Sequence, residues 1–229
     1  MPHFDLEVGE DGTVTQVRKD GDPYKAAVQL EQVYTVVSTY FRLASDHLRA
    51  MSEQESANEL RGSGLQSFVM SLTGLEAFAN TYFHVRGNQL GSAAILQRLE
   101  QRSGTLSRKF ADLIAMTPEQ FVTDQATLID RIFQFSNLRN TIMHPRWTPS
   151  SMSLPGIHID GLVENPQAIF EDANFCREAH YWCLLLIARI GEAQGISRID
   201  GFLFHWTGYY GMTLATILNE LGFSPETIA

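Results

Sequence analysis

A helical pattern runs through LQSFVMSLTGLEAFANTYF, residues 65–83. Its apolar side chains recur at steps of three and four residues, which places them on one face of an α-helix. They are Leu65, Phe68, Leu72, Leu75, Ala79 and Phe83. We expect a helix over about 57–85 that packs this face on a hydrophobic core and ends at Gly87, since glycine commonly ends helices.

Two segments precede this helix, and their apolar side chains recur with different periods. Asp22-Pro23 is typical of a helix start, because aspartate caps helices and proline is tolerated at the first helical position. One apolar face then continues to the end of that helix: Ala27, Leu30, Tyr34, Val37, Phe41, Ala44, Leu48 and Met51. Residues 1–21 instead alternate apolar and polar side chains on both sides of Gly9–Gly12, which predicts a β-hairpin.

The segments after it are mostly helical as well. We expect short helices at 92–103 and 105–116. Thr117-Pro118-Glu119-Gln120 has the pattern of a capping box that starts a further helix, which Pro145 ends. Residues 146–165 contain proline and glycine without a helical period, and predict a loop with room for a short strand at 157–163.

Asn165-Pro166 begins the C-terminal helical region, 166–229. Its first helix is expected to end near Gly195, and its segment YWCLLLIARI (181–190) is apolar on nearly every side, as in a helix enclosed by others. The aromatic segment FLFHWTGYYG (202–211) precedes a last amphipathic helix at 213–221. The pattern as a whole predicts an all-α helical bundle over 22–229 with a small N-terminal β-hairpin at 1–21.

Composition is that of a globular protein. Of 229 residues, 44% are hydrophobic and 19% are charged. The longest apolar run, Tyr181–Ala188, is far below the roughly 18 residues that a membrane span needs. The N-terminus has no secretory pattern, and Cys176 and Cys183 lie two helical turns apart, too far for a disulfide within one helix. We expect a soluble cytoplasmic protein with no membrane partner.

Charge is unevenly distributed along the chain. The formal net charge is −9, which argues against a protein covered with basic residues for indiscriminate nucleic-acid binding. Residues 81–150 hold eight bases and five acids, a net charge of +3, so the remainder carries −12. This basic middle either attracts an anion to one place or reflects chance clustering on solvated helix faces.

Common cofactor and metal motifs are absent. The chain has no CxxC, HExxH, GxxxxGK[ST] or GxGxxG, so we predict neither a cofactor nor a metal site. His180 and Cys183 have helical spacing, but two ligands do not make a zinc site, and a packed histidine beside a buried thiol is the favoured interpretation. His158 and Asp160 form a similarly weak pair.

The segment FSNLRNTIMHPRW, 135–147, contains an arginine on the apolar face of its predicted helix. Arg139 falls on the apolar stripe that Leu128, Ile132, Phe135 and Ile142 define, where arginine is rare without a paired anion. Glu76 falls on the apolar face of the helix quoted above, between Leu72 and Ala79. We therefore predict an ion pair between Glu76 and Arg139, which either fixes helix register or serves a functional site.

His144 precedes Pro145, and residues before proline are displaced from the α region, so its imidazole is expected to project from the helix end. Asn140 lies four residues earlier on the same side, within reach to orient it. Arg139 lies about 140° away around a regular helix. Arg139 and His144 therefore converge only if the last turn unwinds or if two chains contribute to one cleft.

These residue types suit a phosphodiester. Histidine moves protons near neutral pH, and arginine neutralises charge on phosphate with bidentate geometry. The substrate would be RNA, because only RNA carries the internal 2′-hydroxyl nucleophile.

Arg139-Asn140-Thr141-Ile142-Met143-His144 resembles the R-polar-x3-H motif of HEPN domains. SLTGLEAFAN, 71–80, is similar to the preceding helix of that family, where a glutamate and an asparagine recur, here Glu76 and Asn80. The resemblance spans about 57–147. Arg42 to His47 and Arg198 to His205 have similar spacing, but 139–144 is distinguished by three features together: Asn follows Arg, His precedes a helix-ending Pro, and a glutamate-bearing apolar helix comes upstream.

The resemblance implies a metal-independent endoribonuclease of toxin or phage-defence type, acting as a homodimer. It assigns catalysis to Arg139, Asn140 and His144, with Glu76 and Asn80 supporting them, and cleavage to 2′,3′-cyclic phosphate and 5′-hydroxyl ends. A protein antitoxin is an implied partner. The alternative is a non-catalytic HEPN-like interaction or dimerisation module, in which Glu76–Arg139 is structural and the aromatic tail (Phe202, Phe204, Trp206, Tyr209, Tyr210) is a partner surface.

Overall fold

The computed structural model describes eight segments of the chain: 4–8, 14–24, 33–101, 104–118, 122–144, 149–162, 166–209 and 211–223. The chain divides into two compact units, Met1–Gln32 and Val33–Ala229. The described residues of the first unit are mainly strands, and those of the second are mainly helices.

The N-terminal unit contains a three-stranded antiparallel sheet of β1 (Phe4–Val8), β2 (Val14–Lys19) and β3 (Asp22–Pro23). The predicted pairing of β1 with β2 is confirmed, but the predicted helix start at Asp22-Pro23 is wrong. Asp20 and Gly21 have φ of 53° and 89°, the positive values of a two-residue hairpin turn. This Asp-Gly turn brings residues 22–23 back onto β2, so Asp22-Pro23 forms a strand and does not begin a helix.

Helices form most of the described C-terminal unit. They are α1 (Val33–Met51), α2 (Ala57–Leu90), α3 (Ala93–Glu100), α4 (Leu106–Ala115), α5 (Gln125–Met143), the 3₁₀ helix η1 (Pro166–Glu171), α6 (Ala173–Ala193), α7 (Ile199–Thr207) and α8 (Leu214–Glu220). The predicted fold class, mainly α with small β elements, is confirmed. None of the described helices combines the length and apolar character needed to cross a membrane.

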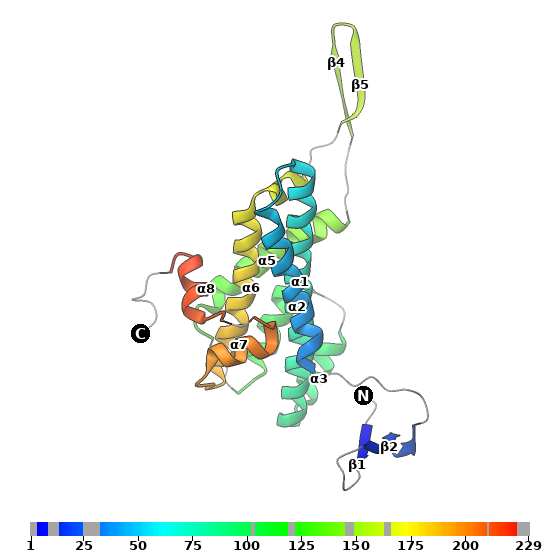
Figure 1. Cartoon of the computed structure of the whole chain (residues 1–229), viewed down its shortest axis with the longest axis vertical. Helices are drawn as coiled ribbons and strands as arrows, with labels where there is room; N and C mark the ends of the chain where they lie inside the picture. Colours follow the sequence, from blue (N-terminus) through cyan, green and yellow to red (C-terminus); the bar gives the residue numbers. More distant parts are fainter. Residues whose placement is uncertain are drawn as a thin grey trace. The chain divides into compact units, whose positions relative to one another are not determined.

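The central helix is α2, with α1 and α6 running beside it (Figure 1). Its predicted inner face is buried, from Phe68 to Phe83. A second row of small residues, which the one-sided pattern did not predict, is buried too: Ser63, Gly64, Ser67, Ser71 and Gly74. At Gly64 an added Cβ would clash with the carbonyl oxygen of Phe170, so the absence of a side chain is what lets η1 approach α2.

The predicted end of α2 at Gly87 is wrong. The helix continues to Leu90, and Gly91, with φ of 61°, is its left-handed C-cap. Gly87 has a packing role instead, because a Cβ there would lie 2.9 Å from Cγ2 of Ile95 in α3.

The predicted start of α5 at the Thr117–Gln120 box is also wrong. Residues 119–121 lie outside the described segments, and α5 begins at Gln125 after Asp124. The Thr117 hydroxyl donates to the carbonyl of Ile114, so it completes the end of α4 rather than capping α5. A serine or threonine in such a box can bond either to the end of the preceding helix or to the start of the next one, and Thr117 bonds to the preceding helix.

The region after α5 is more regular than predicted. The strand expected at 157–163 is β5 (Ile157–Leu162), and it pairs with an unpredicted β4 (Ser150–Leu154) to form a hairpin. Pro166 opens η1 rather than α6, which starts later because the Asp172 side chain caps it by accepting from the N–H of Asn174. Asn165 and Pro145 lie outside the described residues.

The core gathers around α6, as its all-round apolar segment predicts. Residues 183–188 have no exposed surface. The first part of the aromatic segment forms α7, and the predicted last helix is α8, whose N-cap is Thr213. Helices from both ends of the unit therefore enclose one core.

Candidate functional site

The C-terminal end of α5 presents His144. The helix keeps regular backbone geometry to Met143, and His144 is its C-cap with φ of −131° and ψ of 62°. Its N–H still donates to the Asn140 carbonyl at 3.0 Å. The residue before Pro145 has thus left the α region, as predicted, and its side chain is exposed.

The predicted ion pair between Glu76 and Arg139 is present. Nη1 of Arg139 lies 3.3 Å from Oε2 of Glu76, joining α5 to α2. The Arg139 side chain is 21% exposed and the Glu76 side chain 45%, so the guanidinium is mostly enclosed while its carboxylate partner remains wet. Pairing offsets the cost of taking the guanidinium out of water.

A second cation reaches the same face of α2. Nζ of Lys109, in α4, donates to Oδ1 of Asn80 at 2.5 Å. Partial burial lowers the pKa of Lys109, while nearby Glu76 raises it and Arg98 lowers it further. Glu76 and Asn80, one turn apart, thus face one cation from α5 and one from α4. We call Glu76, Asn80, Lys109 and Arg139 the α2 polar cluster.

Lys109 was not among the predicted site residues. In the sequence it is one base of the locally basic middle, and nothing in its neighbours indicates a partner 29 positions away. Only the packing of α4 against α2 brings the two side chains together. Its helical neighbour Arg108 is exposed and lines a groove on another side of α4.

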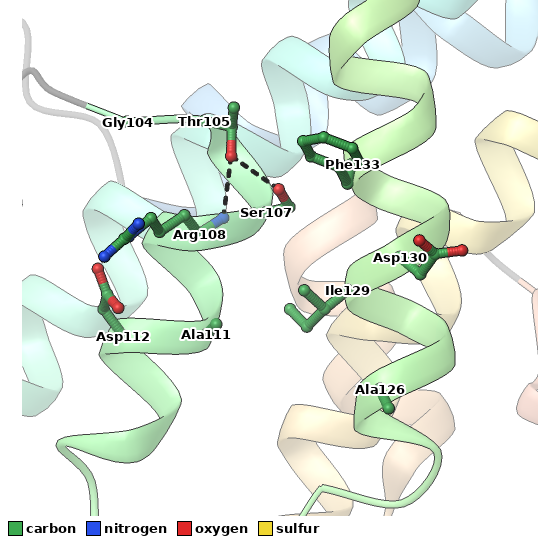
Figure 2. Close-up of a pocket in the computed structure, with 10 residues that line it drawn as sticks. All are labelled: Gly104, Thr105, Ser107, Arg108, Ala111, Asp112, Ala126, Ile129, Asp130 and Phe133. Carbon is green, nitrogen blue, oxygen red and sulfur yellow. Dashed lines mark hydrogen bonds between the residues drawn. The ribbon is translucent and has the colours of Figure 1, made fainter.

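An open groove of about 730 Å³ lies between α4 and α5. Figure 2 shows Ile129 and Phe133 pointing from α5 toward α4, with Ala111 across from them. At one end, the Thr105 hydroxyl accepts from the N–H of Arg108 and lies 2.8 Å from the hydroxyl of Ser107. The groove is therefore apolar along its floor and polar at the start of α4, and the carboxylates of Asp112 and Asp130 line it as well.

One exposed stripe of α5 continues from this groove to the candidate histidine. Steps of three and four residues place its members on a single helix face. They are Ala126, Asp130, Phe133, Asn137, Asn140 and His144, all exposed. A chain molecule seated in the groove along α5 would therefore arrive at Asn140 and His144.

Arg139 and His144 do not meet within one chain. Because α5 is helical to Met143, the two side chains leave the helix about 140° apart. Among the described residues, no hydrogen bond or ion pair joins them. The unwinding of the last turn that would bring them together in one chain is not seen, which leaves the two-chain arrangement as the way to combine them.

His180 is a packed residue, as the sequence favoured. Its Nδ1 lies 2.7 Å from Oγ of Ser71 and its Nε2 lies 2.9 Å from the hydroxyl of Tyr209, which in turn donates to the carbonyl of Phe41. Complete burial lowers the pKa of His180 to about 3. Burial also raises the pKa of the Cys183 thiol, so this pair is neutral and enclosed. Within the described segments, no three His, Cys, Asp or Glu side chains are grouped to hold a metal ion.

His158 has two polar partners on the β4–β5 hairpin. Oγ of Ser153 lies 2.7 Å from Nδ1, and Oδ1 of Asp160 lies 3.0 Å from Nε2. Serine, histidine and aspartate also form hydrolytic triads, but those sit in a cleft beside an oxyanion hole. Here all three side chains are exposed on a two-stranded hairpin. The arrangement serves the hairpin, and we assign it no catalysis.

Comparison of the chain with models of protein families, with curated proteins and with solved structures gave no match. The HEPN resemblance therefore rests on the residues themselves: the R-polar-x3-H segment, its place at a helix end, and the glutamate-bearing helix that pairs with it.

Proposed function

We propose that the chain is a HEPN-type, metal-independent endoribonuclease of toxin or phage-defence type. The observation that supports this most is the Glu76–Arg139 pair: it holds a guanidinium at the helix end that also presents His144 to solvent. RNA cleavage through the 2′-hydroxyl requires a fixed arginine and an accessible histidine, which two chains would bring together in one site.

The reaction assigns one role to each side chain. His144 takes the proton from the ribose 2′-hydroxyl as its oxygen bonds to phosphorus. The bond from phosphorus to the 5′-oxygen breaks, and that oxygen takes a proton from water, to which the His144 imidazolium returns the one it accepted; 2′,3′-cyclic phosphate and 5′-hydroxyl ends remain. Arg139 stabilises the charge on phosphate, and Asn140 orients the imidazole. Glu76 positions Arg139, while Asn80 holds Lys109 in the α2 polar cluster.

The active unit in this proposal is a homodimer. Arg139 and His144 point in different directions from one α5, so a complete site takes the arginine of one chain and the histidine of another. The groove between α4 and α5 would guide single-stranded RNA toward the site. Such an enzyme would act in the cytoplasm, and a protein antitoxin that covers this face would silence it.

One observation favours a second function. Arg139 is four-fifths enclosed and already paired, which suits a structural ion pair that fixes the register of α5 on α2. The chain would then be a non-catalytic interaction module of the same fold. It would need neither an exposed histidine nor a free guanidinium edge.

An assay for cleavage of end-labelled RNA by the purified chain in EDTA distinguishes the ribonuclease from the interaction module. We expect cleavage by the wild type and a loss of at least about 100-fold in His144→Ala, the range of general acid–base catalysis. His158→Ala is the matched control, because that histidine is also exposed but lies on the hairpin. Equal activity of both variants would point away from His144, and an inactive wild type would favour the interaction module.

A further inference from the structure

A separate pocket gathers aromatic side chains from three helices. Phe202, His205 and Trp206 of α7 meet Tyr34 of α1 and Tyr82 of α2. The Tyr34 and Trp206 rings lie 4.7 Å apart edge to face, and the Tyr82 ring lies 5.9 Å from that of Trp206. Three of these five residues come from the aromatic segment, and none belongs to the candidate ribonuclease site.

The walls of this pocket are fixed by packing behind them. The Phe78 ring stacks on Tyr82 at 5.0 Å and meets Trp206 edge to face at 4.9 Å. Phe202 rests on Gly191 of α6, where a Cβ would lie 2.8 Å from the ring. Rings held in this way keep their orientation without a ligand, which lowers the entropy cost of binding one.

The pocket is of a size that takes a small molecule. Its volume is about 320 Å³, near the lower end of ligand sites. Trp206 and Tyr82 are 5% and 9% exposed and form a dry interior, whereas Gln89 and His205 are exposed at the rim. Tyr34 is 36% exposed, and its ring contacts that of His205 at 5.6 Å at the rim of the pocket.

The polar lining identifies the kind of ligand. Arg86 and Gln89 of α2 and Gln194 after α6 line the pocket beside the rings. Each glutamine amide both donates and accepts, and so matches the ring nitrogens and exocyclic groups of a heterocycle. None of the described residues that line the pocket carries a carboxylate, which makes it unsuited to an organic cation despite its aromatic walls.

We propose that this pocket binds a purine base, stacked on its aromatic walls and read by the glutamine amides at its edge. The base has two possible sources, a free mononucleotide or the exposed base of single-stranded RNA. The proposal does not rest on the ribonuclease activity, since the pocket shares no residue with the α2 polar cluster or with His144.

Isothermal titration of the full chain tests it with two probes, adenosine 5′-monophosphate and a short oligoadenylate. We expect saturable binding of at least one probe. Tyr34→Ala should weaken it about tenfold or more through lost stacking. Gln89→Ala should weaken it roughly threefold to tenfold through a lost hydrogen bond. Gln97→Ala, the same change on the exposed face of α3, should leave affinity unchanged.

The outcomes differ in meaning. Binding of the mononucleotide identifies a free nucleotide as the ligand, and binding of the oligonucleotide alone identifies a strand. No binding of either probe at millimolar concentration would overturn the proposal. So would affinity unchanged in both pocket variants while each retains the wild-type melting temperature. His144→Ala should bind as the wild type does, which keeps this result separate from the cleavage assay.

Discussion

Arg139 lies where two helices meet, and its geometry distinguishes a guanidinium from a point charge. Nη1 of the group lies 3.3 Å from Glu76, and 21% of the Arg139 side chain remains exposed. The planar guanidinium has donors on two edges, whereas the ammonium group of lysine is a point charge without separate edges.

Replacement of Arg139 by lysine therefore tests its role in the proposed enzyme. We expect Arg139→Lys to lose RNA cleavage nearly as completely as Arg139→Ala, by about 100-fold or more, as for a lost transition-state charge stabiliser. Initial rates on one RNA substrate measure this. A lysine variant within about threefold of the wild type would show that charge alone suffices.

The burial of His180 should make the stability of the fold depend on pH. Burial lowers its pKa to about 3 in the folded chain, against 6.5 for an ordinary histidine. Between these values the unfolded chain binds a proton that the folded chain does not, so stability falls as the pH falls through 6.5 toward 3. We expect a loss of about 2 kcal/mol in the free energy of unfolding between pH 7 and pH 5.

Urea denaturation at several pH values measures this dependence. In His180→Asn the part of the slope due to this residue should vanish, even though the variant is less stable throughout. His158→Gln, on the exposed hairpin, should keep the wild-type slope. Equal slopes in the wild type and His180→Asn would contradict a neutral buried histidine.

At the scale of elements, replacing two glycines of α2 by alanine should have opposite effects on stability. A Cβ on Gly62 meets nothing within 4 Å, but one on Gly64 meets the Phe170 carbonyl and lies 2.9 Å from Sγ of Cys176. Gly62→Ala should stabilise the chain by about 0.5–1 kcal/mol through helix propensity. Gly64→Ala should destabilise it by about 1–3 kcal/mol, because η1 must move away.

Thermal or urea unfolding of the two variants, measured side by side, checks this. The substitution and helix are the same in both, so the difference reports only what surrounds each glycine. Two stabilised variants would mean that η1 does not pack closely on α2.

Elements with long apolar patterns were predicted correctly, and most errors lie at their boundaries. The inner face of α2 and the enclosed α6 follow from periodicity because burial enforces it. The starts at Asp22 and Thr117 were wrong, and Pro166 begins η1 rather than α6, because each signal admits two uses and neighbouring residues decide between them. The second buried row of α2 could not be predicted, since serine and glycine carry no hydrophobic signal.

The candidate site was predictable in part. Glu76 and Arg139 were identified because each is a charged residue on an apolar face, which demands a partner of opposite sign. The link from Lys109 to Asn80 was missed because neither side chain interrupts an apolar pattern. The aromatic pocket was missed too, since its rings come from positions 34, 82 and 202–206 and converge only in the fold.

At the scale of the whole molecule, the separation of Arg139 and His144 around α5 predicts complementation. Arg139→Ala and His144→Ala should each be inactive, and an equal mixture that exchanges subunits should regain about one quarter of wild-type activity. Half of the dimers are then mixed, and one of the two sites in each is intact. No recovery in a mixture shown to exchange would place both residues of a site in one chain.

The chemistry of the RNA product is the most direct test of the proposed function. An RNA whose cleaved nucleotide lacks its 2′-hydroxyl is compared with the unmodified RNA, in EDTA, and the product ends are analysed. We predict 2′,3′-cyclic phosphate and 5′-hydroxyl ends from the unmodified RNA and no cleavage at the 2′-deoxy position. Cleavage that persists at the 2′-deoxy position, or products ending in a 3′-hydroxyl, would contradict attack by the 2′-hydroxyl and the roles given to Arg139 and His144.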